Sequence, residues 1–262
     1  MSRRAAADTF AVAAGFERIT FPHASLPIVG YQNNSPSQRV VIFLEGDGAS
    51  WETRHRVSAD PTPRQFVGLR IAASITNAQV IYLGRPCQFV TEAELSSCDA
   101  SHWTDRRFSS EIIDRYMEII GSLVGQYPAD NIEIAGYSGG GVIAAVQAAR
   151  IREITQLVTI AAPLDTDSWV SHHGVSPLDE PVDPISYLSD LCTVQQTHYY
   201  GELDDIVPLA TISAFKAAME NCADTTFVLA AGQDHSCCWT APDSPLVEYW
   251  NESRFHGKEE QQ

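Results

Sequence analysis

The sequence lacks several features that would point to a membrane, nucleic-acid-binding or metal-binding protein. No apolar run approaches the ~18 consecutive residues that a membrane-spanning helix requires, so no transmembrane segment is expected. Only 17 Lys and Arg face 33 Asp and Glu, and the net charge of −16 disfavours binding to nucleic acid or anionic membranes. No C-x-x-C pair occurs, which excludes zinc-ribbon and thioredoxin-like sites. Residues 1–7 contain two arginines with no apolar segment after them, so no intact signal peptide is visible.

What remains is the composition of a globular domain. The 262 residues are 44% apolar and 19% charged, which is ordinary for a globular protein. A chain of this length can bury a substantial core within one large domain. No internal repeat and no linker divides it, so residues 1–262 are expected to form a single domain.

Short apolar, β-branched runs alternate with segments of helical periodicity along most of the chain. Strands are expected at residues 17–21, 27–32, 39–44, 79–83, 132–136, 154–160, 197–200 and 225–230. Helices are expected at residues 5–15, 63–74, 108–127, 142–150, 208–220 and 245–255. This alternation predicts an α/β fold with a mostly parallel, doubly wound sheet flanked by helices. Residues 164–195, rich in Asp, Ser and Pro, are expected to form a long loop or a small cap.

The segment Gly136-Tyr137-Ser138-Gly139-Gly140 carries the pattern G-x-S-x-G between an expected strand and an expected helix. In this setting the pattern is typical of a nucleophile elbow, a turn so sharp that its flanking positions must lack side chains. The alternative is a glycine-rich helix start that only packs closely or binds an anion. Ser138 is therefore the predicted nucleophile.

A serine hydroxyl needs a positioned base and a group that orients this base. His235 follows the last expected strand, and Asp204 follows the strand before it. Like Ser138, both lie at carboxyl ends of expected strands, where doubly wound sheets bind their ligands. The chain order Ser138, Asp204, His235 is that of an α/β-hydrolase triad, with Asp205 as an alternative acid.

Residues 39–239 thus resemble an α/β-hydrolase-fold serine hydrolase of the esterase and lipase type. The resemblance implies that Asp204, within Gly201-x-x-Asp204-x-x-Val207-Pro208, is the acid that orients His235. Asp165, which follows an earlier strand, is a third candidate because some family members take the acid from there.

An oxyanion hole requires two backbone N–H groups directed at the tetrahedral oxygen. The geometry of the fold assigns one to Gly139, directly after the nucleophile. The other is assigned to Asp47 in the loop Glu45-Gly46-Asp47-Gly48, where family members often carry His-Gly-x-Gly. The residues around these donors are expected to contact the substrate: Gly46, Gly48 and Tyr137.

Two carboxylates in this loop depart from the family pattern. Unless Glu45 and Asp47 turn away or are hydrogen-bonded, their charge would oppose the negative charge that develops on the oxyanion. Arg85 and Arg54 are the candidates for neutralising one of them.

Further motifs resemble a group of bacterial α/β-hydrolases, many of which look exported or lipid-anchored. The motifs are Glu45-Gly46-Asp47-Gly48-x-x-Trp51, Asp60-Pro61-Thr62-Pro63, Arg85-Pro86-Cys87-Gln88, and Trp103-Thr104 followed by Arg107-Phe108-Ser109. Together with the cysteine content, this resemblance favours a periplasmic, secreted or envelope-associated location.

Six cysteines allow disulfides in an oxidising compartment, with reduced thiols as the alternative. Cys87 and Cys98 flank a short loop that a bridge would close. The pair Cys192–Cys222 precedes two strands that should be neighbours, so a bridge is expected there too. A disulfide between adjacent residues is rare, and the pair Cys237–Cys238 is expected only to pack.

These residues predict an enzyme that cleaves a carboxylic ester, or a thioester, of a small molecule through an acyl-Ser138 intermediate. The chemistry needs no cofactor or metal, and the pair His172-His173 has no partner at metal-ligand spacing. Amide, peptide or lactone hydrolysis and acyl transfer are alternatives on the same triad. A hydrolase-fold binding protein with a silent site is the alternative of another class.

Overall fold

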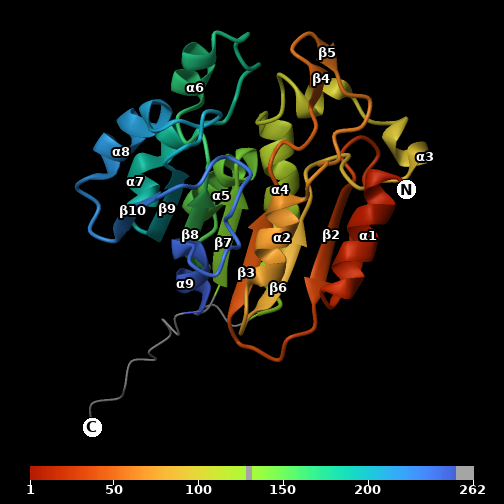
Figure 1. Cartoon of the computed structure of the whole chain (residues 1–262), viewed down its shortest axis with the longest axis horizontal. Helices are drawn as coiled ribbons and strands as arrows, with labels where there is room; N and C mark the ends of the chain where they lie inside the picture. The colour runs from red at the N-terminus through yellow and green to blue at the C-terminus, as the bar shows by residue number, and fades with distance from the viewer. Residues whose placement is uncertain (128–131, 252–262) are drawn as a thin grey trace.

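A central sheet organises the molecule (Figure 1). The structure is a computed structural model that describes residues 1–127 and 132–251. Eight strands follow the order β1-β2-β6-β3-β7-β8-β9-β10, in which β2 is antiparallel to both of its neighbours and all other pairs are parallel. The mostly parallel sheet predicted from the sequence is confirmed. The strands are β1 (Phe16–Phe21), β2 (Ile28–Asn33), β3 (Val40–Leu44), β6 (Gln79–Leu83), β7 (Ile132–Tyr137), β8 (Ile154–Ile160), β9 (Gln195–Gly201) and β10 (Thr225–Ala230).

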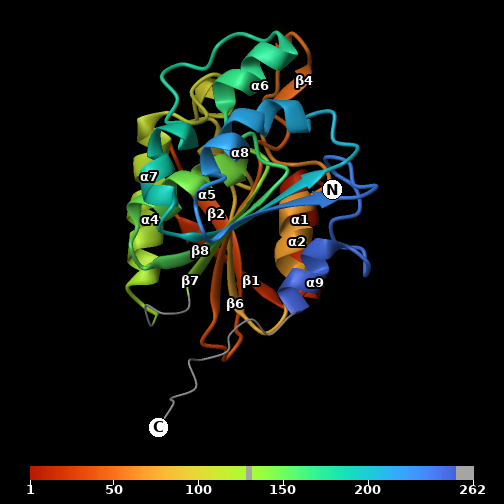
Figure 2. The ribbon, with the colours of Figure 1, turned by 90° about the vertical axis from the view of Figure 1, so that its left-hand side faces the viewer.

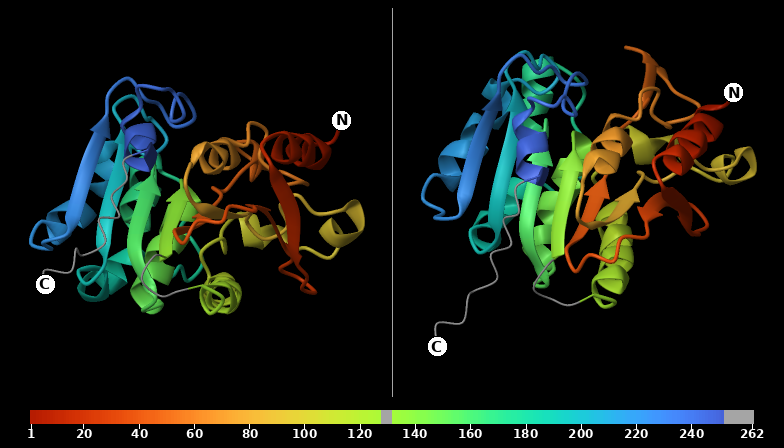
Figure 3. Two further views of the ribbon diagram at one scale, coloured as in Figure 1. Left: turned by 90° about the horizontal axis from the view of Figure 1, so that it is seen from below. Right: turned by 60° about the horizontal axis from the view of Figure 1, so that its bottom comes forward.

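Helices cover both faces of this sheet (Figure 2 and Figure 3). One layer contains α1 (Arg3–Ala13), α2 (Val67–Ser74) and α9 (Pro245–Asn251). The other contains α4 (Ser110–Val124), α5 (Gly139–Arg150), α7 (Leu188–Leu191) and α8 (Ser213–Met219).

Strand β3 packs against helices on both faces of the sheet. Because side chains alternate across a strand, Val40, Ile42 and Leu44 pack in the core beneath α4 and α5. Val41 and Phe43 pack in the core beneath α1 and α2. All five side chains are buried, which is why the sequence shows one continuous apolar run there.

Several helix bounds differ from the predicted ones. Helix α5 begins at Gly139 rather than residue 142, so the glycines after Ser138 are already helical. Helix α2 begins at Val67 rather than residue 63, because the left-handed φ of 51° at Phe66 interrupts a right-handed helix. The predicted helix 208–220 divides into η4 (Leu209–Ile212) and α8. Residues 252–255 of the predicted closing helix lie outside the described residues.

Two excursions lie near the carboxyl end of the parallel strands, at the top of Figure 1. The predicted loop or cap, residues 164–195, contains α6 (Thr166–His173), which lies at this end, and η3 (Pro184–Tyr187) and α7, which contact α5 in the helix layer. The hairpin of β4 (Trp51–Thr53) and β5 (Arg56–Val57) was not predicted, because such short strands display no periodicity. The remaining short helices are α3 (Glu92–Leu95) and η1 (Ala100–Trp103).

All six cysteines lie in pairs at disulfide-bonding distance. The predicted pairs Cys87–Cys98 and Cys192–Cys222 are both formed, with Cα atoms 6.3 and 5.0 Å apart. The expectation that Cys237 and Cys238 only pack is wrong, since their sulfurs also lie at bonding distance. Cys238 has a φ of 76°, and this sharp local turn brings the adjacent side chains together. Within residues 1–127 and 132–251, no helix is long and apolar enough to cross a membrane.

Candidate active site

Ser138 occupies a strained turn between β7 and α5. Its φ of 51° and ψ of −128° are unusual for a residue with a side chain. Two flanking glycines permit the turn: a Cβ on Gly136 would collide with the carbonyl of Gly140, and one on Gly140 would collide with the carbonyl of Glu45. The turn has the geometry that the sequence pattern predicted.

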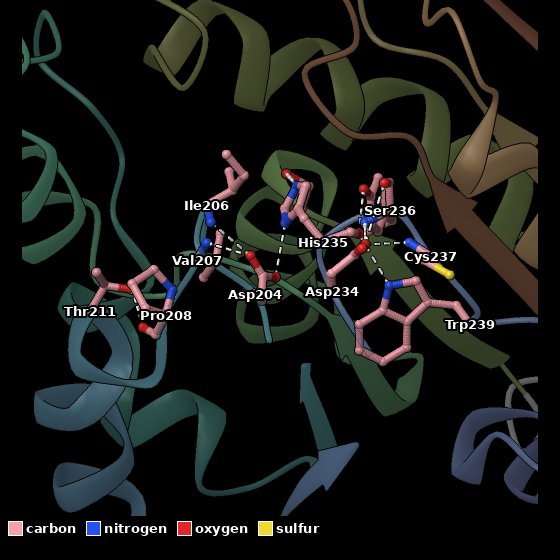
Figure 4. A network of polar contacts seen from close by, with 12 residues as sticks. Asp204, Ile206, Val207, Pro208, Thr211, Asp234, His235, Ser236, Cys237 and Trp239 are labelled. Carbon is pink, nitrogen blue, oxygen red and sulfur yellow. Dashed lines mark hydrogen bonds and ion pairs between the residues drawn. The ribbon is translucent and has the colours of Figure 1, made fainter. Parts of the chain in front are cut away.

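His235 lies between Ser138 and Asp204, and these three residues come from three different loops at the carboxyl ends of the strands. Its Nε2 is 3.1 Å from Ser138 Oγ. Its Nδ1 is 2.9 Å from Asp204 Oδ2, and Figure 4 shows this contact. The other oxygen of Asp204 accepts the backbone N–H groups of Ile206 and Val207 at 2.9 and 2.7 Å. Because the carboxylate can only accept, Nδ1 carries the proton and Nε2 is free to accept the serine proton.

The two alternative acids point elsewhere. Asp165 accepts hydrogen bonds from the backbone N–H and the hydroxyl of Ser168, and so caps the start of α6. Asp205 is exposed, whereas Asp204 is 4% exposed. Of the three acids considered, Asp204 is the one in contact with His235.

The loop that carries His235 is held from both sides (Figure 4). The backbone carbonyl of His235 accepts the hydroxyl of Tyr137 at 2.8 Å and Nε1–H of Trp239 at 3.1 Å. Next to it, Asp234 Oδ1 accepts the N–H groups of Ser236 and Cys237, and these bonds lower the pKa of the Asp234 carboxyl. The imidazole is therefore positioned by its backbone as well as by Asp204.

Glu45 turns away from Ser138 and into the protein. Its carboxylate accepts the N–H of Gly46 at 2.8 Å, those of Gly68 and Leu69 at 3.2 Å each, and the hydroxyl of Tyr82 at 2.7 Å. Gly68 and Leu69 belong to the first turn of α2, so Glu45 caps that helix from a distant part of the chain. Burial raises the pKa of Glu45, while these hydrogen bonds oppose the rise.

Asp47 is neutralised by two guanidinium groups. Arg85 donates to Asp47 Oδ1 at 2.7 Å, and Arg107 Nε lies 3.1 Å from Oδ2. Of the two predicted candidates, Arg85 has this role, whereas Arg54 lies exposed in the turn of the β4–β5 hairpin. Arg107 was not predicted as a partner; its only sequence signal was its place in the Trp103–Ser109 motif.

Further bonds fix the backbone on either side of the Asp47 amide. Gln88 Nε2 donates to the carbonyl of Gly46 at 3.1 Å, and the hydroxyl of Ser50 donates to the carbonyl of Asp47 at 2.8 Å. Gly139 is the first residue of α5, so its N–H has no acceptor within the helix. Both predicted oxyanion donors therefore belong to rigid backbone.

A pocket of about 530 Å³ opens beside Ser138 and His235. The predicted contact residues Gly48 and Tyr137 line it, whereas Gly46 lies beneath Ser138, where a Cβ would come within 3.0 Å of the serine Cβ. Apolar side chains form much of the remaining wall: Trp51, Pro63, Phe66, Val67, Pro163, Trp169, Ile206 and Val207. No group of three or more potential metal ligands is found within the described ranges.

No family model and no curated protein sequence matches the chain. Solved structures do. The chain is similar to Pyrococcus furiosus esterase Pf2001 (14% identity, TM-score 0.57, 86% of each chain covered) and to Est1E from Butyrivibrio proteoclasticus (11%, 0.57, 89% of this chain and 95% of that one). It is also similar to a Mycobacterium tuberculosis puromycin-hydrolyzing peptidase (13%, 0.61), of which it covers 38% while 91% of this chain is covered. The protein has an α/β-hydrolase fold.

Identities of 11–14% establish the fold alone, and the chemistry must be inferred from the residues. In this α/β-hydrolase fold the predicted site residues gather at one edge of the sheet. Ser138 follows β7, Asp204 follows β9, His235 follows β10, and Asp47 follows β3. The carboxyl ends of the strands thus bring these residues to one edge of the sheet, where Asp47, Ser138 and His235 line the pocket.

Proposed function

We propose that the protein is a serine hydrolase that cleaves a carboxylic ester, or a thioester, through an acyl-Ser138 intermediate. The proposal rests on the contacts from Asp204 through His235 to Ser138, at 2.9 and 3.1 Å, beside a pocket large enough for a small acyl compound. A carboxylate, an imidazole and a hydroxyl in this order form the catalytic unit of acyl transfer in several unrelated folds.

In the acylation step, Ser138 Oγ attacks the ester carbonyl while its proton moves to His235 Nε2. Asp204 keeps the imidazole in the tautomer with hydrogen on Nδ1 and stabilises the imidazolium that forms. The imidazolium then gives its proton to the departing alcohol. A water molecule, deprotonated by the same nitrogen, attacks the acyl-serine and releases the carboxylic acid.

The tetrahedral oxygen would be bound by the N–H groups of Asp47 and Gly139. The carboxylates of Glu45 and Asp47 do not oppose the binding of an oxyanion, because Glu45 faces α2 and Asp47 is paired with Arg85 and Arg107. Gly139 N–H lies at the N-terminus of α5, where the helix dipole also favours negative charge. A preorganised pair of this kind contributes about 10²- to 10³-fold to kcat for each donor.

The proposal also covers the extent of the domain, the bacterial group to which the protein belongs and its location. We infer that residues 1–262 form one hydrolase domain with residues 164–195 as a small cap. We also infer membership in the bacterial group with the Glu45-Gly46-Asp47-Gly48-x-x-Trp51 loop. The exported or envelope location follows from that resemblance and from the three cysteine pairs.

Hydrolysis of 4-nitrophenyl esters from acetate to octanoate tests the proposal. Wild-type protein should hydrolyse at least the shorter esters, and Ser138→Ala should lower kcat by roughly 10⁴-fold or more. Ser213→Ala, an exposed serine at the start of α8, is the matched control and should retain full activity. Absence of wild-type hydrolysis across the series, or full activity in Ser138→Ala, would refute the proposal.

A further inference from the structure

The wall of the pocket beside Ser138 carries more positive than negative charge. Arg107 lines this pocket with its side chain 11% exposed, and Arg85 lies directly behind it with its side chain 4% exposed. Both guanidinium groups share one carboxylate, that of Asp47. The two mostly buried guanidinium groups therefore have one carboxylate in direct contact, and Asp105 acts on Arg107 only from further away.

Among the described residues no other acid forms an ion pair with Arg85 or Arg107. Glu45 is directed into the protein and engaged by the N–H groups at the start of α2. Asp204 is engaged by His235 and by two backbone N–H groups. Arg64, exposed on the pocket wall, adds a further cation, and no ion-pair partner for it is found among the described residues.

Arg107 is also held rigidly and only partly satisfied. Its Nη1 donates to the carbonyl of Thr104 at 3.0 Å, and its guanidinium carbon lies 5.4 and 5.3 Å from the ring centres of Phe108 and Trp169. Its Nε lies 3.1 Å from Asp47 Oδ2 and is buried, so it faces the protein, whereas no hydrogen bond of Nη2 is found among the described residues. A fixed, planar guanidinium with spare donors is well suited to bind a carboxylate.

We propose that Arg107 binds a carboxylate carried by the substrate, so that the preferred substrates are esters bearing an anionic group. This inference rests on the serine-hydrolase function proposed above and names its substrate class. Two mostly buried guanidinium groups that share one carboxylate are incompletely neutralised, and incomplete neutralisation of a buried charge is costly. The oxyanion would offset that cost only briefly during the reaction, whereas a substrate carboxylate would offset it in every bound state.

Two series of paired esters test the inference. In the first, 4-nitrophenyl half-esters of glutaric, adipic and suberic acid are compared with their methyl-capped counterparts, after subtraction of the uncatalysed rate. In the second, the charge is on the leaving group, and 3-carboxy-4-nitrophenyl acetate is compared with 4-nitrophenyl acetate. The quantity measured is the ratio of kcat/KM for the anionic ester to that for the neutral ester. This ratio is independent of the fraction of active enzyme, because both esters report on the same preparation.

Wild-type protein should prefer the anionic ester in at least one series, and Arg107→Met should lower that ratio roughly 10- to 100-fold, as expected for loss of a charge-assisted contact. Asp47 stays paired with Arg85 in this variant. Arg107→Lys, which keeps the charge, should retain part of the preference. The control is Arg106→Met: Arg106 pairs with Glu111 and Asp179 and does not line the pocket, so the wild-type ratio should persist.

No preference in either series would overturn the inference while leaving ester hydrolysis intact. An equal loss for anionic and neutral esters in Arg107→Met would also overturn it and assign Arg107 to the oxyanion. Failure on every ester, in contrast, would contradict the hydrolase function itself. If Arg107→Met does not fold, wild-type hydrolysis of a neutral ester should be inhibited by glutarate at least tenfold more strongly than by glutaramide, and equal inhibition would refute carboxylate binding.

Discussion

Replacement of Glu45 should destabilise the protein by an amount that the structure allows us to estimate. Glu45 is 1% exposed, and each carboxylate oxygen accepts two hydrogen bonds. Helix α2 has no cap of its own, since the Phe66 side chain makes no capping bond. In Glu45→Gln the new amide nitrogen is best placed at Oε2, where the Tyr82 hydroxyl can rotate to accept and only Leu69 N–H loses its acceptor.

One orphaned buried N–H costs about 1–3 kcal/mol, so Glu45→Gln should lower the free energy of unfolding by that amount. Glu45→Ala removes the acceptor for three backbone N–H groups and leaves a cavity, and should cost about 4 kcal/mol or more. Urea denaturation with an unchanged m-value provides the measurement. Glu52→Gln, which removes an exposed ion pair with Arg56, is the control and should stay within about 0.5 kcal/mol of wild type.

The reasoning fails if Glu45→Gln is as stable as wild type, or if Glu45→Ala costs no more than Glu45→Gln. Either result would mean that these hydrogen bonds do not hold the loop before Asp47. The substitutions should also lower catalytic activity, because Glu45 is the first residue of the loop that carries the proposed oxyanion donor Asp47. At temperatures where both variants are fully folded, kcat should fall more than KM rises.

Three further predictions concern the acid, a disulfide and a buried histidine. Asp204→Asn should lower kcat by roughly 10³- to 10⁴-fold and Asp205→Asn by less than about twofold; equal effects in ester assays would contradict the assignment of the acid. Reduction of Cys192–Cys222, probed with the double serine variant, should cost about 3–4 kcal/mol by the loop-entropy model, and an unchanged urea midpoint would refute it. Burial lowers the pKa of His198 from 6.5 to about 3, so the unfolded chain binds the extra proton and stability should be lost as pH falls below about 6.5, by up to ~1.4 kcal/mol per pH unit. His198→Gln should flatten this slope in urea titrations at pH 7, 6 and 5, and an equal slope would contradict the neutral buried imidazole.

The fold could be predicted from the sequence because its strongest determinants are patterns among neighbouring residues. The apolar runs in β3 and β6 reflect burial on both faces of the sheet. Such a run can be recognised from neighbouring positions in the sequence alone. The turn at Ser138 is local in part: Gly136 is required by contact with Gly140 four residues on, whereas Gly140 is required by contact with Leu44 and Glu45, far away in the chain. The order of the predicted triad added a long-range expectation, and the structure brings those three side chains into contact.

What the sequence did not indicate depends on contacts between distant segments. Arg107 contacts Asp47, which lies 60 positions earlier in the chain, and Glu45 caps a helix that begins at Val67. Neither contact leaves a periodic signal. The pair Cys237–Cys238 depends on a left-handed residue in an irregular loop, where propensities carry little information.

Labelling with a fluorophosphonate tests the central proposal, nucleophilic catalysis by Ser138, most directly. Such a reagent phosphonylates only a serine that is activated by its neighbours. Intact-mass measurement and peptide mapping of the full chain should find one phosphonyl group per molecule, attached to Ser138 and absent from Ser138→Ala. Folded wild-type protein that stays unlabelled, or that is labelled equally in Ser138→Ala, would contradict the assignment of Ser138 as the nucleophile.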